Sequence, residues 1–182
     1  KYNIEPDMMM LGKTLGNGYA ITAVLGKRDI MKSAEECFIS STFWTERIGP
    51  TAAIKTLEIM EKHNSWDIIT GIGHKIIQKW KELAAVNNLK IEISGIPSLA
   101  NFKILSNDWI KYKTLITQDL LKKNILASNT VYSCIKHSDD LLEEYFEALN
   151  EVFKLISKCE NGMRIDDLLN GPVCHSGFKR LN

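Results

Sequence analysis

Residues 6–19 read Pro-Asp-Met-Met-Met-Leu-Gly-Lys-Thr-Leu-Gly-Asn-Gly-Tyr, and they place Lys13 where an apolar run ends and a glycine-rich turn begins. A second apolar run, from Ala20 to Gly26, follows the turn. Short apolar runs bounded by glycine are typical of buried parallel strands. We therefore expect two such strands flanking Lys13, in a setting that suits an amine held for covalent chemistry.

The residues around Lys13 allow two other interpretations. A phosphate-binding P-loop needs glycine five residues before Gly12, where Asp7 stands, so that motif does not fit. The other interpretation is a solvated lysine after a strand, which is what most lysines are. Without further information, the solvated lysine is the favoured interpretation.

The run resembles the lysine segment of the class III, glutamate-1-semialdehyde-type aminotransferases, whose signature is Pro-Asp, a short strand, Gly-Lys, Gly-x-Gly and a second apolar strand. This resemblance implies an α/β chain: the C-terminal part of a fold type I transferase dependent on pyridoxal 5'-phosphate (PLP), with the end of the large-domain sheet and a small α+β domain. It also implies that Lys13 is catalytic and binds PLP as a Schiff base, acting first as nucleophile and then as general acid and base.

Residues 41–50 read Ser-Thr-Phe-Trp-Thr-Glu-Arg-Ile-Gly-Pro and hold a second candidate site. The resemblance implies that a threonine here contacts the PLP phosphate across a homodimer interface. Thr42 matches the start of the family pattern and is preferred, while Thr45 matches by its distance from Pro50. The more frequent roles are strand pairing for Thr42 and helix capping for Thr45. Arg47 has two possible roles: it binds a carboxylate of the substrate, or it forms a weak surface ion pair with Glu46.

Hydrophobic periodicity predicts three long helices and one shorter one. The first begins near Gly49-Pro50, with proline in its first turn, and is broken at residues 63–65. The second runs from Ser65 to the asparagines at 87 and 88, a third covers residues 108–123, and the last has Ser138 as its N-cap. Extended segments are predicted at residues 38–43, 91–95, 99–105, 124–128 and 131–135.

This order of elements predicts three regions. Residues 1–62 would end a large PLP-binding domain and include a connecting helix. Residues 63–158 would form a small α+β domain, and residues 159–182 an irregular tail. By resemblance, the acidic partner of the PLP ring, the phosphate loop and the stacking aromatic residue precede Lys13, so this chain is expected to hold an incomplete active site.

Composition narrows the class of function. The chain has 182 residues with 45% hydrophobic and 25% charged residues and a net charge of +1, which argues against nucleic-acid binding. No apolar stretch approaches the roughly 20 residues that span a bilayer. Four cysteines without a C-x-x-C pair argue for a reducing cytoplasm and against a metal site, and Cys174, His175 and His74 lack metal-ligand spacing.

The leading hypothesis is a PLP-dependent aminotransferase that acts on a small amino donor and a carbonyl acceptor as a homodimer. Residues 16–19, Gly-Asn-Gly-Tyr, depart from the triple-glycine form associated with the aminomutases, which favours a transaminase. The alternatives are an aminomutase (an isomerase) and a non-catalytic fragment or homologue without a complete cofactor site.

Overall fold

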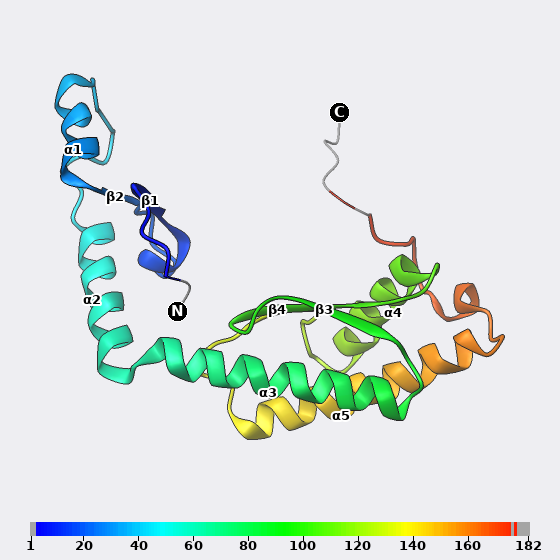
Figure 1. Ribbon diagram of the computed structural model, residues 1–182. Coiled ribbons are helices and arrows are strands. Elements are labelled where there is room, and N and C mark those ends of the chain that lie inside the picture. The colour runs from blue at the N-terminus through cyan, green and yellow to red at the C-terminus, as the bar shows by residue number, and fades with distance from the viewer. Residues whose placement is uncertain (1–2, 176, 178–182) are drawn as a thin grey trace. The chain divides into compact units, whose positions relative to one another are not determined.

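The computed structural model describes residues 3–175 and 177, and these divide into two compact units between Ser65 and Trp66 (Figure 1). The first unit holds a two-stranded ribbon and one long helix. Its elements are β1 (Met8–Leu11), η1 (Lys13–Leu15), β2 (Ala23–Gly26), α1 (Arg28–Met31), η2 (Lys32–Glu36) and α2 (Ile48–His63).

The ribbon of the first unit differs from the expectation of parallel strands. β1 and β2 pair antiparallel, with Met8 opposite Gly26 and Leu11 opposite Ala23. A parallel pair needs a crossover of a dozen or more residues, usually a helix. The chain between β1 and β2 is shorter and folds into η1 and a turn, so it returns the second strand alongside the first in the opposite direction.

The expected burial of these strands is also wrong within this unit. Met10 is 82% exposed, and most residues of β1 and β2 are exposed. Among the described residues of the first unit, Ala53 is the one buried hydrophobic residue. Many large apolar side chains are exposed there: Met8, Met9, Met10, Val24, Leu25, Ile30, Phe38, Ile39, Phe43, Trp44, Ile48, Ile54, Leu57 and Ile59.

The connection between η2 and α2 holds no strand, although residues 38–43 were expected to be extended. Residues 42–45 form a turn instead. The hydroxyl of Ser41 accepts a hydrogen bond from the amide of Phe43, and the carbonyl of Ser41 accepts one from the amide of Trp44. α2 begins at Ile48, two residues before Pro50, and ends at His63. Asn64 follows in the left-handed conformation (φ 50°). The predicted helix break is therefore confirmed.

The second unit packs three helices with a small antiparallel sheet. Strands β3 (Ile91–Ile96), β4 (Leu99–Ile104) and β5 (Thr130–Tyr132) lie in the order β3-β4-β5. Helices α3 (Ser65–Val86), α4 (Trp109–Lys122) and α5 (Asp139–Glu160) supply most of the core, with η3 (Ile165–Leu168) beyond them (Figure 1). Trp80, Phe102, Leu149 and Phe153 are fully buried at its centre.

Two glycines in α3 have different surroundings. A Cβ atom on Gly73 would lie 1.8 Å from the carbonyl oxygen of Pro97, in the turn between β3 and β4. Glycine at position 73 therefore allows this turn to approach the helix backbone. A Cβ atom on Gly71 would meet open space.

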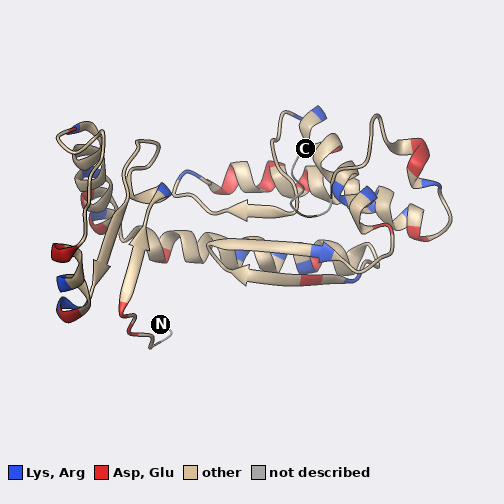
Figure 2. Cartoon of the chain, turned by 90° about the horizontal axis from the view of Figure 1, so that it is seen from above, with Lys and Arg blue, Asp and Glu red and all other residues tan. Residues whose placement is uncertain are grey.

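The prediction of a strand at residues 124–128 is wrong. Asn124 has a φ of 62°, and the amide of Ile125 donates to the carbonyl of Leu120, so this segment closes the end of α4. Of the strand predicted at residues 131–135, Val131 and Tyr132 pair with β4, and Thr130 pairs with it as well. The predicted cap of α5 is confirmed, because Ser138 Oγ accepts a hydrogen bond from the amide of Leu141. Acidic residues gather in the first half of α5 (Figure 2), and the helix dipole favours the two in its first turn, Asp139 and Asp140.

The described part of the tail is docked on the second unit. Ile165 is buried in the core, and Gln118 of α4 donates to the carbonyl of Leu168 and accepts from the amide of Asn170. Thr114 accepts from the amide of Cys174. No helix in the described ranges is both long and apolar enough to cross a membrane.

Candidate functional site

The backbone of Lys13 adopts an unusual conformation. Apart from glycine, six of the described residues have a positive φ: five asparagines and Lys13, whose φ is 46°. Asparagine tolerates this left-handed region because its short polar side chain bonds locally, whereas lysine has no such compensation. Strained residues of this kind cluster at functional sites. The backbone conformation at position 13 therefore does not itself favour lysine.

Consecutive turns hold the segment after Lys13. The amide of Asn17 donates to the carbonyl of Lys13, and the amide of Tyr19 donates to the carbonyl of Gly16, both at 3.1 Å. Gly16 is buried, and a Cβ atom there would lie 2.1 Å from the carbonyl oxygen of Tyr19. The Lys13 side chain is exposed and forms no ion pair or hydrogen bond with any described residue.

The two candidate threonines lie in the turn before α2. Thr42 does not pair in a strand and Thr45 does not cap the helix, so neither has the structural role that threonine most often takes. Both are exposed, and neither hydroxyl is hydrogen-bonded within the described ranges. No hydrogen bond joins either threonine to Lys13, so the geometry does not choose between them.

Glu46 caps α2, and sequence reasoning missed this role. Its carboxylate accepts hydrogen bonds from the amides of Ile48 and Gly49, the latter at 2.9 Å. Free amides at a helix start attract anions, and these two already face the Glu46 carboxylate. The expected ion pair between Glu46 and Arg47 does not form among the described residues. An acidic residue just before a helix start is the signal that could have revealed the cap.

The start of α2 packs on the segment that follows Lys13. Gly49 is buried, and a Cβ atom on it would lie 2.7 Å from the carbonyl oxygen of Ala20 and 3.2 Å from Cβ of Ile21. η1 also contacts α2. A shallow pocket of about 400 Å³ opens beside this contact, lined by Tyr19, Arg47, Ile48, Thr51, Ala52 and Lys55. The first unit thus joins the Lys13 segment and the threonine turn through one helix end.

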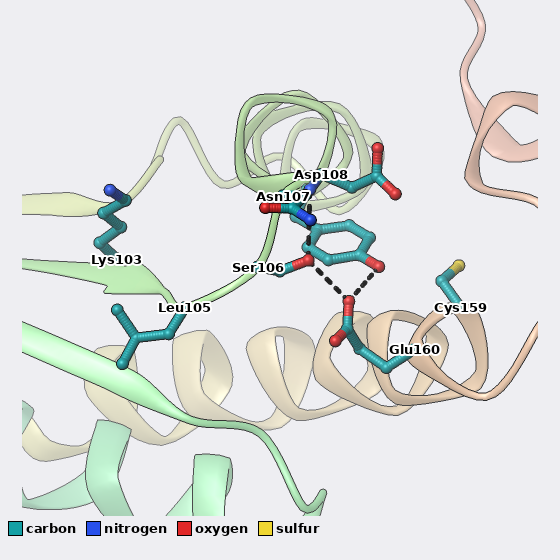
Figure 3. Close-up of a pocket in the computed structure, with 8 residues that line it drawn as sticks. Lys103, Leu105, Ser106, Asn107, Asp108, Cys159 and Glu160 are labelled. Carbon is teal, nitrogen blue, oxygen red and sulfur yellow. Dashed lines mark hydrogen bonds between the residues drawn. The ribbon is translucent and has the colours of Figure 1, made fainter.

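A polar pocket of about 690 Å³ lies in the second unit, between the start of α4 and the end of α5 (Figure 3). Glu160 Oε1 accepts from the hydroxyls of Tyr112 (2.5 Å) and Ser106 (2.8 Å). Burial, and then the hydrogen bond to Glu160, raise the pKa of Tyr112. Burial also raises the pKa of the Cys159 thiol, which disfavours the nucleophilic thiolate. These groups fasten two helix ends together and offer no activated nucleophile.

The described residues contain no group of three or more His, Cys, Asp or Glu side chains placed to hold a metal ion. All four cysteines are free thiols.

The sequence of this chain matches the model of a known family, Aminotransferase class-III, over residues 1–137. The chain belongs to the class III aminotransferases. The resemblance seen in the Lys13 segment is thereby confirmed, and the matched region includes Lys13, Thr42 and Thr45.

Two relatives illustrate the range of the family. A 3-aminobutyryl-CoA aminotransferase of Cloacimonas acidaminovorans is 29% identical over 86% of this chain and 39% of its own length. A glutamate-1-semialdehyde 2,1-aminomutase of Sulfurisphaera tokodaii is 28% identical over 83% of this chain and 40% of its own length. The chain thus spans about two fifths of these class III relatives.

A solved structure confirms the α/β fold. The FumI protein of Sphingopyxis sp. MTA144, in its PLP internal aldimine form, matches 91% of this chain and 41% of its own, with a TM-score of 0.79 and 21% identity. The expected α/β fold is therefore confirmed.

Proposed function

We propose that the complete protein is a PLP-dependent aminotransferase that carries an amino group from a small amino donor to a carbonyl acceptor. The observation that supports this most directly is Lys13: an exposed primary amine on a left-handed backbone, in the segment matched by the class III family. We further propose a homodimer in the cytoplasm, a setting that suits four free thiols.

Three side chains of this chain are suited to binding PLP. Among the residues that the structure describes, the Lys13 amine and the hydroxyls of Thr42 and Thr45 have no competing partner. Thr42 remains the preferred phosphate contact and Thr45 the alternative. The cofactor would supply an aldehyde with which the amine condenses, and a ring that withdraws electrons from the substrate.

Lys13 would serve in two ways. Its Nζ atom is the nucleophile that holds the cofactor until an amino substrate takes its place. The released Nζ can then carry a proton to and from the α-carbon of the substrate. The glycine-rich turn after Lys13 leaves the side chain exposed for both tasks.

An aminomutase is the second candidate, because relatives with that name cover 83–86% of this chain at 25–28% identity. An aminomutase would rearrange its substrate without an added carbonyl acceptor, whereas a transaminase would depend on one. Product analysis with and without the acceptor separates the two.

The proposal is tested by borohydride reduction of the complete protein with PLP, followed by peptide mass mapping. We expect a pyridoxyl adduct on the peptide that contains Lys13. Absence of an adduct at Lys13 would contradict the proposal and favour the hypothesis of a non-catalytic homologue.

A further inference from the structure

We propose that Glu46 is a positioning residue that fixes the turn carrying Thr42 and Thr45 on the first turn of α2, so that these threonines meet the cofactor phosphate across the proposed dimer interface. This inference rests on the proposed function, since it assigns to Glu46 a part in holding the cofactor. It concerns a side chain that would not itself touch the reacting atoms.

Glu46 forms hydrogen bonds through both its backbone amide and its side-chain carboxylate. Its backbone amide donates to the carbonyl of Phe43 at 3.0 Å, which closes the threonine turn onto it. Its carboxylate accepts from the amides of Ile48 and Gly49, in the first turn of α2. One residue therefore links the turn at 42–45 to the helix, and its side chain is half-buried in this position.

The helix end that Glu46 grips is itself fixed to the Lys13 segment. Gly49 lies against the carbonyl of Ala20 and the side chain of Ile21, closer than any other residue type would allow. Ile21 in turn lies within contact of Gly16, three residues after Lys13. The contacts run without a break from the threonine turn through Glu46 and Gly49 to the Lys13 segment.

The carboxylate also determines which groups remain for a phosphate. Unpaired amides at a helix start attract anions, and here Glu46 is the anion that Ile48 and Gly49 bind. Within the turn at 41–46 and the first turn of α2, the groups left to meet a cofactor phosphate are then the threonine hydroxyls, in a turn that the Glu46 side chain anchors to the helix. Loss of the Glu46 side chain would free two amides and remove the bonds that hold the turn on α2, while the backbone bonds that close the turn itself remain.

The test uses the complete protein, freed of PLP, in four forms: wild type, Glu46→Ala, Glu46→Gln and the control Glu61→Ala. Glu61 is an exposed carboxylate at the other end of α2, and its side chain has no partner among the described residues. PLP dissociation constants and melting temperatures are measured for each. We expect Glu46→Ala to raise the PLP dissociation constant about tenfold. Glu46→Gln, which keeps one acceptor oxygen, should show a smaller rise, and the control should match wild type.

A cap that serves only stability would lower the melting temperature of Glu46→Ala and leave PLP affinity unchanged below it. That result, or an equal loss in Glu61→Ala, would overturn the inference. If Glu46→Ala fails to fold, Glu46→Gln carries the same comparison, because it preserves the shape of the side chain. If wild type itself fails to bind PLP, the proposed function fails, which is a distinguishable outcome.

Discussion

Lys13 is the exception among the described non-glycine residues with a left-handed backbone, because all the others are asparagine. We predict that Lys13→Asn abolishes turnover of the complete protein while it keeps or raises stability, by up to about 1 kcal/mol, because asparagine suits this backbone better. Turnover assays and thermal unfolding check this. Lys13→Ala should be equally inactive, and turnover in either variant would contradict the catalytic role.

The threonines differ in a testable way. Thr42→Ala in the complete protein should weaken PLP retention, because it removes the preferred phosphate donor, with Thr45→Ala as the matched change three residues along the same turn. PLP content after gel filtration measures the effect. If only Thr45→Ala loses the cofactor, then Thr45 is the phosphate contact.

Tyr112 predicts a pH dependence of stability. Its pKa is raised in the folded state, first by burial and then by the hydrogen bond to Glu160, relative to about 10 in the unfolded chain. Above pH 10 the unfolded state therefore loses a proton that the folded state keeps, so this contribution to stability falls as pH rises. Tyr112→Phe should make stability decline less steeply between pH 9 and about 11, as measured by denaturant unfolding. An unchanged slope would contradict the shift.

At the scale of elements, the two glycines of α3 give a matched pair. Gly73→Ala should destabilise the chain by several kcal/mol, because a Cβ atom would collide with the backbone of Pro97 and push the β3–β4 turn away. Gly71→Ala meets open space and should stabilise the helix by about 0.5–1 kcal/mol. Urea unfolding of both variants checks the contrast. Similar effects of the two changes would show that Pro97 does not approach Gly73 this closely.

The elements also show what the sequence can predict. The helix break at 63–65, the hairpin of β3 and β4 and the Ser138 cap were all predictable, because periodicity and capping are local signals. The direction of β1 and β2 was not, since an apolar run reports expected burial and not which strand lies beside it. For the site, the motif alone pointed to Lys13. For Glu46, its place just before a helix start favours the backbone amides over the neighbouring Arg47 guanidinium, and the structure shows that its carboxylate bonds the amides.

At the scale of the molecule, the two units differ in how much apolar surface they bury. The first unit leaves most of its large apolar side chains exposed, while the second holds a continuous core. We predict that amides of the first unit exchange with deuterium much faster than those of α3 and α5 when the 182-residue chain is studied alone, because few packed contacts oppose local opening. Mass spectrometry of peptides from both units checks this. Equal protection would mean that the first unit is stabilised by contacts within itself.

The placement of the tryptophans gives each unit an optical signal. Trp80 is completely buried in the core of the second unit, whereas Trp44, the tryptophan of the first unit, is 69% exposed in the turn between Thr42 and Thr45. An indole in a dry core emits at shorter wavelength than one in water, so their fluorescence can be separated with Trp→Phe variants. Emission from Trp44 would then respond directly to any ligand that settles against the threonine turn, while emission from Trp80 would follow the folding of the second unit.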